Sequence, residues 1–166
     1  MKPDLEYEYD NWINHLSNIK KLSQNSVISY KNDLSKFLIF FQDHIEKNIG
    51  LKEIENIEIS EFRSFLTHRR NSEISSNSIA RNISALKSFF SFLIRNDKIK
   101  ESSVFNLKSP KLKKSLPRPI NVDLAIKVIK QAEEIEEEKW IGLRNKAILL
   151  LLYGCGLRIS EALSLN

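Results

Sequence analysis

The sequence predicts an all-α protein, because apolar residues recur at steps of three and four along most of its length. No segment shows a strong strand pattern. The chain has 166 residues, of which 42% are hydrophobic, enough for one or two domains with a core. It contains only four prolines, and three of them lie close together in the second half of the chain.

Four amphipathic stretches occupy the first hundred residues. The first runs from about residue 5 to residue 19 and is expected to turn Ile19 inward. Ser23 and Ser60 are candidate N-caps of the second and third stretches, and the fourth begins near Asn77. These four stretches predict a helical bundle in the N-terminal part.

The fourth stretch has one face without acidic residues. Opposite its apolar stripe, this face carries cations and small hydroxyl side chains, including Arg81, Ser84, Lys87 and Ser88. Arginine, lysine and serine are the residue types that contact phosphate oxygens. The face therefore suits a phosphate-bearing partner, and the alternative is a plain solvent-facing side.

A basic segment with prolines divides the chain. Residues 106–120 contain three prolines, no acid and five cations: Lys108, Lys111, Lys113, Lys114 and Arg118. The prolines prevent a continuous helix and favour an extended path. The pattern predicts a linker between residues 1–105 and residues 121–166, either following a nucleic-acid backbone or acting as a solvated tether.

The positive charge is concentrated in the middle of the chain. Residues 1–60 hold 7 Lys/Arg against 10 Asp/Glu, a balance of −3, and residues 61–120 hold 13 against 4, a balance of +9. Residues 121–166 hold 6 against 7, a balance of −1. Such concentration indicates a polyanion partner, with a lysine-rich solvated surface as the alternative.

Near the C-terminal end, an arginine follows a glycine corner. Residues 147–153 are all apolar and predict a helix that is buried on most sides, and Gly154 and Gly156 suit its C-cap. Arg158 then stands at the start of a new helix with Glu161 in its first turn. This corner suits phosphate binding, although an ordinary surface arginine beside a cap has the same spacing.

Several classes of protein are disfavoured by the composition. The single cysteine, Cys155, cannot form an internal disulfide or a cysteine-based zinc site. The acidic start lacks the apolar segment of a secretion signal, and the longest apolar run is far too short to cross a bilayer. We therefore expect a cytoplasmic protein with no cysteine-based zinc site and no membrane partner.

Five blocks occur in a characteristic order. They are residues 22–41, with Ser23, Asn25, Tyr30, Asp33 and Leu34; residues 79–93; residues 109–117; residues 143–147; and residues 153–163, Tyr-Gly-Cys-Gly-Leu-Arg-Ile-Ser-Glu-Ala-Leu. In this order they resemble the phage integrase, or tyrosine recombinase, family and within it the Xer type. The resemblance spans nearly the whole chain, and its last block is the most specific.

The resemblance implies a four-helix, SAM-like core-binding domain over residues 1–105, the basic linker over residues 106–120, and the opening of a catalytic domain over residues 121–166. Members of the family clamp duplex DNA between two domains and assemble four protomers on two sites. A tyrosine attacks the scissile phosphate and forms a 3′-phosphotyrosyl link, without metal or cofactor. The resemblance does not distinguish a recombinase for DNA integration from one for chromosome dimer resolution.

The resemblance also assigns residues. Arg158 matches the first catalytic arginine, which contacts the scissile phosphate, and Glu161 matches an acidic position that supports it. Helical face and family position together suggest these DNA contacts: Ser23, Asn25, Lys31, Arg81, Ser84, Lys87, Ser88, Lys111, Lys113 and Lys114.

The remaining catalytic residues of the family have no counterpart here. The family places a lysine, a His-x-x-Arg motif, a His or Trp and the nucleophilic tyrosine after the arginine block, whereas every tyrosine and histidine of this chain precedes Arg158. We therefore expect a chain truncated early in the catalytic domain that binds DNA without cleaving it, with residues 121–166 less protected than residues 1–105. The alternatives are a non-catalytic DNA-binding module and a helical protein-interaction domain.

Overall fold

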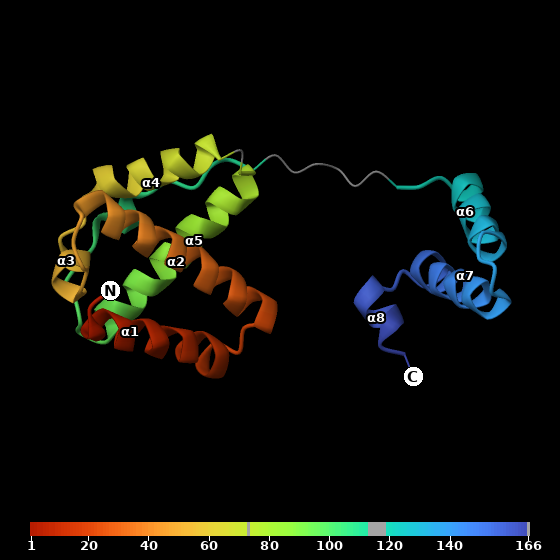
Figure 1. The fold of residues 1–166 in the computed structure, drawn as a ribbon, viewed down its shortest axis with the longest axis horizontal. Coiled ribbons are helices and arrows are strands. Elements are labelled where there is room, and N and C mark those ends of the chain that lie inside the picture. The colour runs from red at the N-terminus through yellow and green to blue at the C-terminus, as the bar shows by residue number, and fades with distance from the viewer. Residues whose placement is uncertain (73, 113–118, 166) are drawn as a thin grey trace. The chain divides into compact units, whose positions relative to one another are not determined.

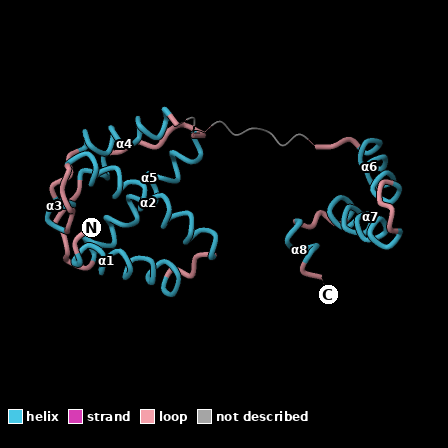
Figure 2. The backbone as a smooth tube through the Cα atoms, in the orientation of Figure 1, coloured by secondary structure: helices cyan, strands magenta, loops and turns pink. Residues whose placement is uncertain are grey.

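A computed structural model describes residues 1–72, 74–112 and 119–165 of the chain. All regular secondary structure in these residues is helical, as Figure 2 shows. The chain divides into two compact units, Met1–Lys113 and Lys114–Asn166, each of which is described by itself. The prediction of an all-α protein is confirmed.

Among its described residues, the first unit contains five α-helices and two short helical turns, and the longer helices can be followed in Figure 1. They are α1 (Pro3–Asn14), the π-helical turn η1 (His15–Ile19), α2 (Gln24–Ile45), α3 (Leu51–Glu55), α4 (Ile59–Asn71), α5 (Ser76–Arg95) and the 3-10 turn η2 (Ser103–Asn106). The four long helices occupy the four predicted stretches. The short α3 is an addition that the periodicity did not predict, because five residues are too few to show a period.

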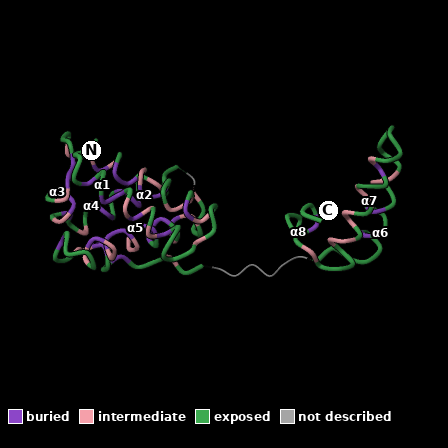
Figure 3. Tube along the Cα trace, turned by 90° about the horizontal axis from the view of Figure 1, so that it is seen from below, coloured by how far each residue is buried: buried purple, intermediate pink, exposed green. Residues whose placement is uncertain are grey.

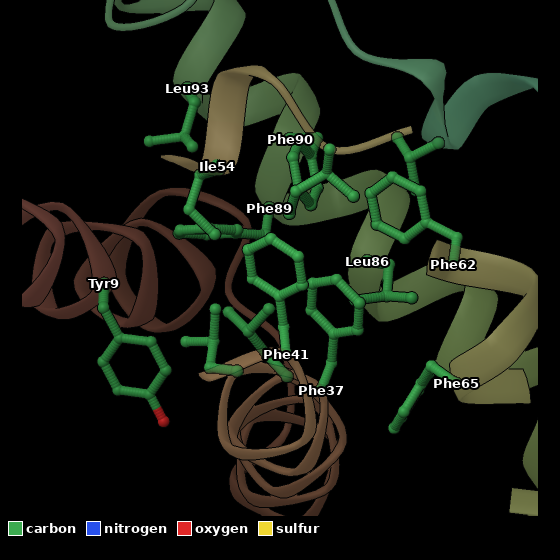
Figure 4. Packing of buried hydrophobic residues seen from close by; sticks show 14 of the residues in the cluster. Tyr9, Phe37, Phe41, Ile54, Phe62, Phe65, Leu86, Phe89, Phe90 and Leu93 are labelled. Atoms are coloured by element: carbon green, nitrogen blue, oxygen red, sulfur yellow. The ribbon is translucent and has the colours of Figure 1, made fainter. Parts of the chain in front are cut away.

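Aromatic side chains from α2, α4 and α5 form the centre of this unit (Figure 4). Phe37 stacks on Phe62 with ring centroids 5.1 Å apart and meets Phe65 edge-on at 5.2 Å. Phe62 in turn meets Phe90 edge-on at 5.3 Å. Such pairs add specific geometry to the burial of large apolar surfaces, so these three helices are held in one arrangement.

Two details of the first unit differ from the predictions. The first helix changes at His15 to a π-helical turn, and Ile19 is exposed rather than inward. A π-turn takes more residues per turn than an α-helix, so it rotates Ile19 away from the buried face. The cap of α4 is Glu58 rather than Ser60, and its backbone N–H donates to Glu61 Oε2 at 2.7 Å.

The second unit contains α6 (Val122–Glu134), α7 (Lys139–Gly154) and α8 (Ile159–Leu163). The helices α6 and α7 approach closely at Gly142, where an added Cβ would lie 2.5 Å from the carbonyl oxygen of Glu133. A salt bridge between Lys146 and Glu133 crosses the same contact. Glycine therefore permits the close packing of the two helices.

The apolar run at the end of α7 is not buried on most sides, and that prediction was wrong. Leu150 is 49% exposed and Tyr153 is 46% exposed, because α6 is the main helix packed against α7 in this unit. Figure 3 shows burial concentrated in the first unit, and only Ala125, Ile129, Gly142 and Ala162 are buried among the described residues of the second.

Candidate nucleic-acid interface

Helix α2 begins with a serine cap that leaves its N-terminal end without negative charge. Ser23 Oγ accepts a hydrogen bond from the backbone N–H of Ser26 at 3.3 Å, and the two hydroxyl oxygens lie 2.9 Å apart. Asn25 and Lys31 are exposed, and the first turn holds no acid. The positive end of the helix dipole is thus available to an anion together with the Asn25 amide, and Lys31 follows about two turns further along α2.

Helix α5 begins in the same way. Ser75 Oγ accepts from the backbone N–H of Ser78 at 3.3 Å, and these two hydroxyl oxygens lie 3.1 Å apart. Asn77 is exposed, and the first turn again holds no acid. Sequence reasoning missed Ser75 and Asn77, although the pattern Ser-x-Asn-Ser occurs at the start of both helices and was the signal available.

Arg81 is joined to α2 by a two-point ion pair. Its Nε donates to Asp33 Oδ2 at 2.7 Å and its Nη2 donates to Asp33 Oδ1 at 3.3 Å. The Asp33 side chain is 1% exposed, whereas that of Arg81 is 46% exposed. The hydrogen bonds that Arg81 donates to Asp33 raise the pKa of Arg81 above its ordinary value, so the guanidinium stays charged. Sequence reasoning proposed Arg81 for DNA but missed Asp33 as its partner.

The other predicted residues of α5 differ in their exposure. Ser84 is exposed and donates to the carbonyl oxygen of Ala80 at 3.0 Å. Lys87 and Ser88 are half-buried and have internal partners: Lys87 Nζ donates to the carbonyl oxygen of Leu107 at 2.8 Å, and Ser88 Oγ accepts from the Trp12 indole at 3.3 Å. The open part of this face therefore lies toward the start of α5.

The linker contributes one described residue to the predicted contacts. Lys111 is exposed. Lys113 and Lys114 lie outside the described residues. Within the described ranges, no three His, Cys, Asp or Glu side chains are grouped closely enough to hold a metal ion, and no helix combines the length and apolar content needed to cross a bilayer.

In the second unit, Arg158 is the N-cap residue of α8. Gly156 adopts a left-handed φ of 67°, and the chain then turns so that the backbone N–H of Arg158 donates to Glu161 Oε2 at 2.7 Å. The other oxygen of Glu161 accepts from Arg158 Nη1 at 3.2 Å. The arginine side chain is 84% exposed. Glu161 thus holds both ends of Arg158 while most guanidinium donors stay open to an anion.

The sequence matches the family model described as phage integrase, N-terminal SAM-like domain, over residues 9–97. A protein named tyrosine recombinase XerC from Brucella suis is 37% identical over 165 residues, covering 99% of this chain and 52% of that protein. Proteins of the same name from Mesorhizobium japonicum and Rickettsia prowazekii are 36% and 39% identical, covering 99% and 93% of this chain and 53% and 51% of their own lengths. The chain therefore spans about half the length of the curated relatives it matches. These matches show that the chain belongs to the phage integrase family, among the Xer-type tyrosine recombinases.

Proposed function

We propose that this chain binds duplex DNA through its first unit, as the N-terminal part of a site-specific recombinase. The observation that carries the proposal is the pair of acid-free, serine-capped starts of α2 and α5, accompanied by Lys31 and Arg81. Positive helix ends and arginine or lysine side chains are the groups that contact phosphates. The family of the chain supports the same partner. A DNA partner also fits a cytoplasmic location.

The proposal divides the chain by role. Residues 1–105 hold the DNA, residues 106–120 follow the backbone as a basic linker, and residues 121–166 contribute to phosphate chemistry. In the whole recombinase, Arg158 stabilises the charge that develops on the scissile phosphate, and Glu161 holds Arg158 in place. Lys111 and its neighbours Lys113 and Lys114 add sequence-independent contacts to the backbone.

Cleavage and rejoining of DNA by four assembled protomers is proposed for the whole recombinase. A covalent step requires a nucleophile, and the tyrosines of this sequence, at positions 7, 9, 30 and 153, all precede Arg158. We therefore propose that these 166 residues bind DNA without forming a 3′-phosphotyrosyl link. A nicked suicide substrate that traps such links tests this point, and a covalent adduct would overturn it.

Fluorescence anisotropy with a labelled duplex of about 30 base pairs, titrated at several salt concentrations, tests DNA binding directly. We expect Lys31→Glu to weaken binding and to lower the slope of log K against log salt by about 1. The matched control is Lys47→Glu, which makes the same charge change at the other end of α2. Lys31 lies about 21 Å from Ile45, the last residue of α2, at a rise of 1.5 Å per residue, and Lys47 follows just beyond that end, so screening should leave the control close to the parent chain.

The outcome also separates the proposed function from the alternative class. A helical protein-interaction domain with an incidental basic middle would not bind the duplex even at low salt. Equal losses for Lys31→Glu and Lys47→Glu would mean that net charge alone attracts DNA, which would contradict the proposed surface.

A further inference from the structure

The ion pair between Asp33 and Arg81 joins a fully buried acid to a half-exposed base. Asp33 belongs to α2 and Arg81 to α5, so the pair crosses the contact between these two helices. The Asp33 carboxylate accepts hydrogen bonds from Arg81 Nε at 2.7 Å and from Arg81 Nη2 at 3.3 Å. These two nitrogens form one edge of the planar guanidinium group. Two bonds to one edge fix both the position and the plane of the group.

The opposite edge of Arg81 has no hydrogen-bond partner among the residues that the structure describes. A guanidinium group has five N–H donors, and Asp33 uses two of them, so the remaining donors are on the Nη1 side and on the outer part of Nη2. Along α5, the exposed residues Asn77 and Ser84 lie four positions before and three positions after Arg81, on the same helical face. Asp33 thus fixes the plane of the Arg81 guanidinium group, while the Arg81 side chain stays 46% exposed beside exposed positions of the same helical face.

From this geometry we infer that Asp33 is a positioning residue for DNA binding: it fixes Arg81 so that the free guanidinium edge meets a phosphate group of the duplex. The inference rests on the proposed DNA binding and deepens it. A buried partner that orients the base removes the conformational entropy that a free arginine would lose on contact. Asp33 itself is buried and does not touch the DNA.

Two other roles for Asp33 predict different results. If the pair only fastened α2 to α5, a folded variant without the acid would bind DNA as the parent chain does. If Asp33 acted only through its charge, its removal would strengthen DNA binding, because one negative charge near the phosphates would be lost. Positioning predicts the opposite sign, weaker binding after a negative charge is removed.

The experiment measures binding of the full chain to the labelled mixed-sequence duplex for Asp33→Asn, Arg81→Lys and the double variant. Circular dichroism establishes that each variant is folded at the assay temperature. We expect each single variant to bind about three to ten times more weakly than the parent chain, since lysine keeps the charge but lacks the fixed fork. The matched control Asp43→Asn removes an exposed acid further along α2 and should leave binding unchanged or slightly stronger.

The double variant identifies the route of the effect. If Asp33 acts through Arg81, Asp33→Asn adds no further loss in the Arg81→Lys background. Parent-like or tighter binding by folded Asp33→Asn would overturn the inference, and so would fully additive losses. If Asp33→Asn does not fold, Arg81→Lys decides alone, and parent-like binding by it would overturn the inference. Failure of the parent chain to bind the duplex would instead refute the proposed function.

Discussion

The two units of this chain use their apolar residues differently. In the first unit, aromatic residues of three helices surround Phe37 and Phe62, and both of these side chains are 0% exposed. In the second unit, large apolar side chains such as Trp140, Leu150 and Ile159 are 60%, 49% and 64% exposed. The first unit therefore has a well-packed helical core. In the second unit the helices bury little of their surface, and Arg158 lies at an exposed turn between two of them.

The largest expected effect is a difference between the units in how much one substitution lowers the free energy of unfolding. Phe62→Ala should lower the free energy of unfolding of the first unit by about 3–5 kcal/mol, because a fully buried aromatic ring leaves a cavity. Leu150→Ala, at a half-exposed position of α7, should change the free energy of unfolding of the second unit by less than about 0.5 kcal/mol, as surface substitutions usually do.

Urea unfolding followed by tryptophan fluorescence measures this contrast, because the two tryptophans are divided between the units, Trp12 in the first and Trp140 in the second. In a Trp140→Phe background only the buried Trp12 reports, which follows Phe62→Ala in the first unit, and in a Trp12→Phe background only Trp140 reports, which follows Leu150→Ala in the second. Equal losses of unfolding free energy for Phe62→Ala and Leu150→Ala would contradict the difference in packing between the two units.

The second prediction compares the two arginines that we assign to phosphate contacts. Arg81→Ala leaves Asp33 buried without its partner, and we expect a loss of about 2 kcal/mol, less than for a fully buried pair because Arg81 is half-exposed to solvent. Arg158→Ala should leave global stability unchanged, because its side chain is 84% exposed. Thermal unfolding of both variants measures the difference, and a larger loss for Arg158→Ala would contradict it.

The third prediction tests how tightly the second unit is packed. Gly142→Ala places a Cβ against the carbonyl oxygen of Glu133 and should weaken the contact between α6 and α7 by about 1–3 kcal/mol. Gly154→Ala is the matched control: no atom lies within 4 Å of its added Cβ, and alanine favours the helix by up to about 1 kcal/mol. Hydrogen exchange of α7 amides should rise in Gly142→Ala and not in Gly154→Ala, and the reverse order would refute the close approach.

The smallest expected effect is the change in melting temperature when an exposed ion pair of the first unit is removed. Lys2 Nζ donates to Glu53 Oε1 at 2.6 Å, and with the backbone N–H of Gly50 it lowers the pKa of Glu53 to about 2. A depressed carboxyl pKa stabilises the folded state above the ordinary pKa of 4.5, and this contribution is lost as pH falls toward 2. The melting temperature of Glu53→Gln should lie slightly below that of the parent chain at pH 7 and equal it near pH 2.

Local features of the fold were predictable from the sequence, and long-range ones were not. The steps of three and four residues predicted the long helices α2 and α5, and Ser23 caps α2 as its position suggested. The π-turn that exposes Ile19 has no signal of its own in the periodicity. The exposure of residues 147–153 depends on which helices cover α7, and that information is not local.

The same division applies to the candidate site. The contact between Arg158 and Glu161 joins residues three positions apart, so the first turn of a helix was enough to predict that they lie together. The partner of Arg81 lies 48 residues away on another helix. The sequence of α5 alone therefore suggested that Arg81 is a free cation, whereas in the folded unit Arg81 is paired with the buried Asp33.

Hydrogen exchange of the full chain with and without duplex DNA tests the central claim most directly, namely that the first unit is the stable body and holds the DNA. Without DNA, amides of α2 and α5 should exchange much more slowly than those of α6 and α7. Addition of the duplex should slow exchange further near residues 23–31 and 75–84, the starts of α2 and α5. Equal protection in both units, or DNA-dependent protection confined to the second unit, would contradict the account.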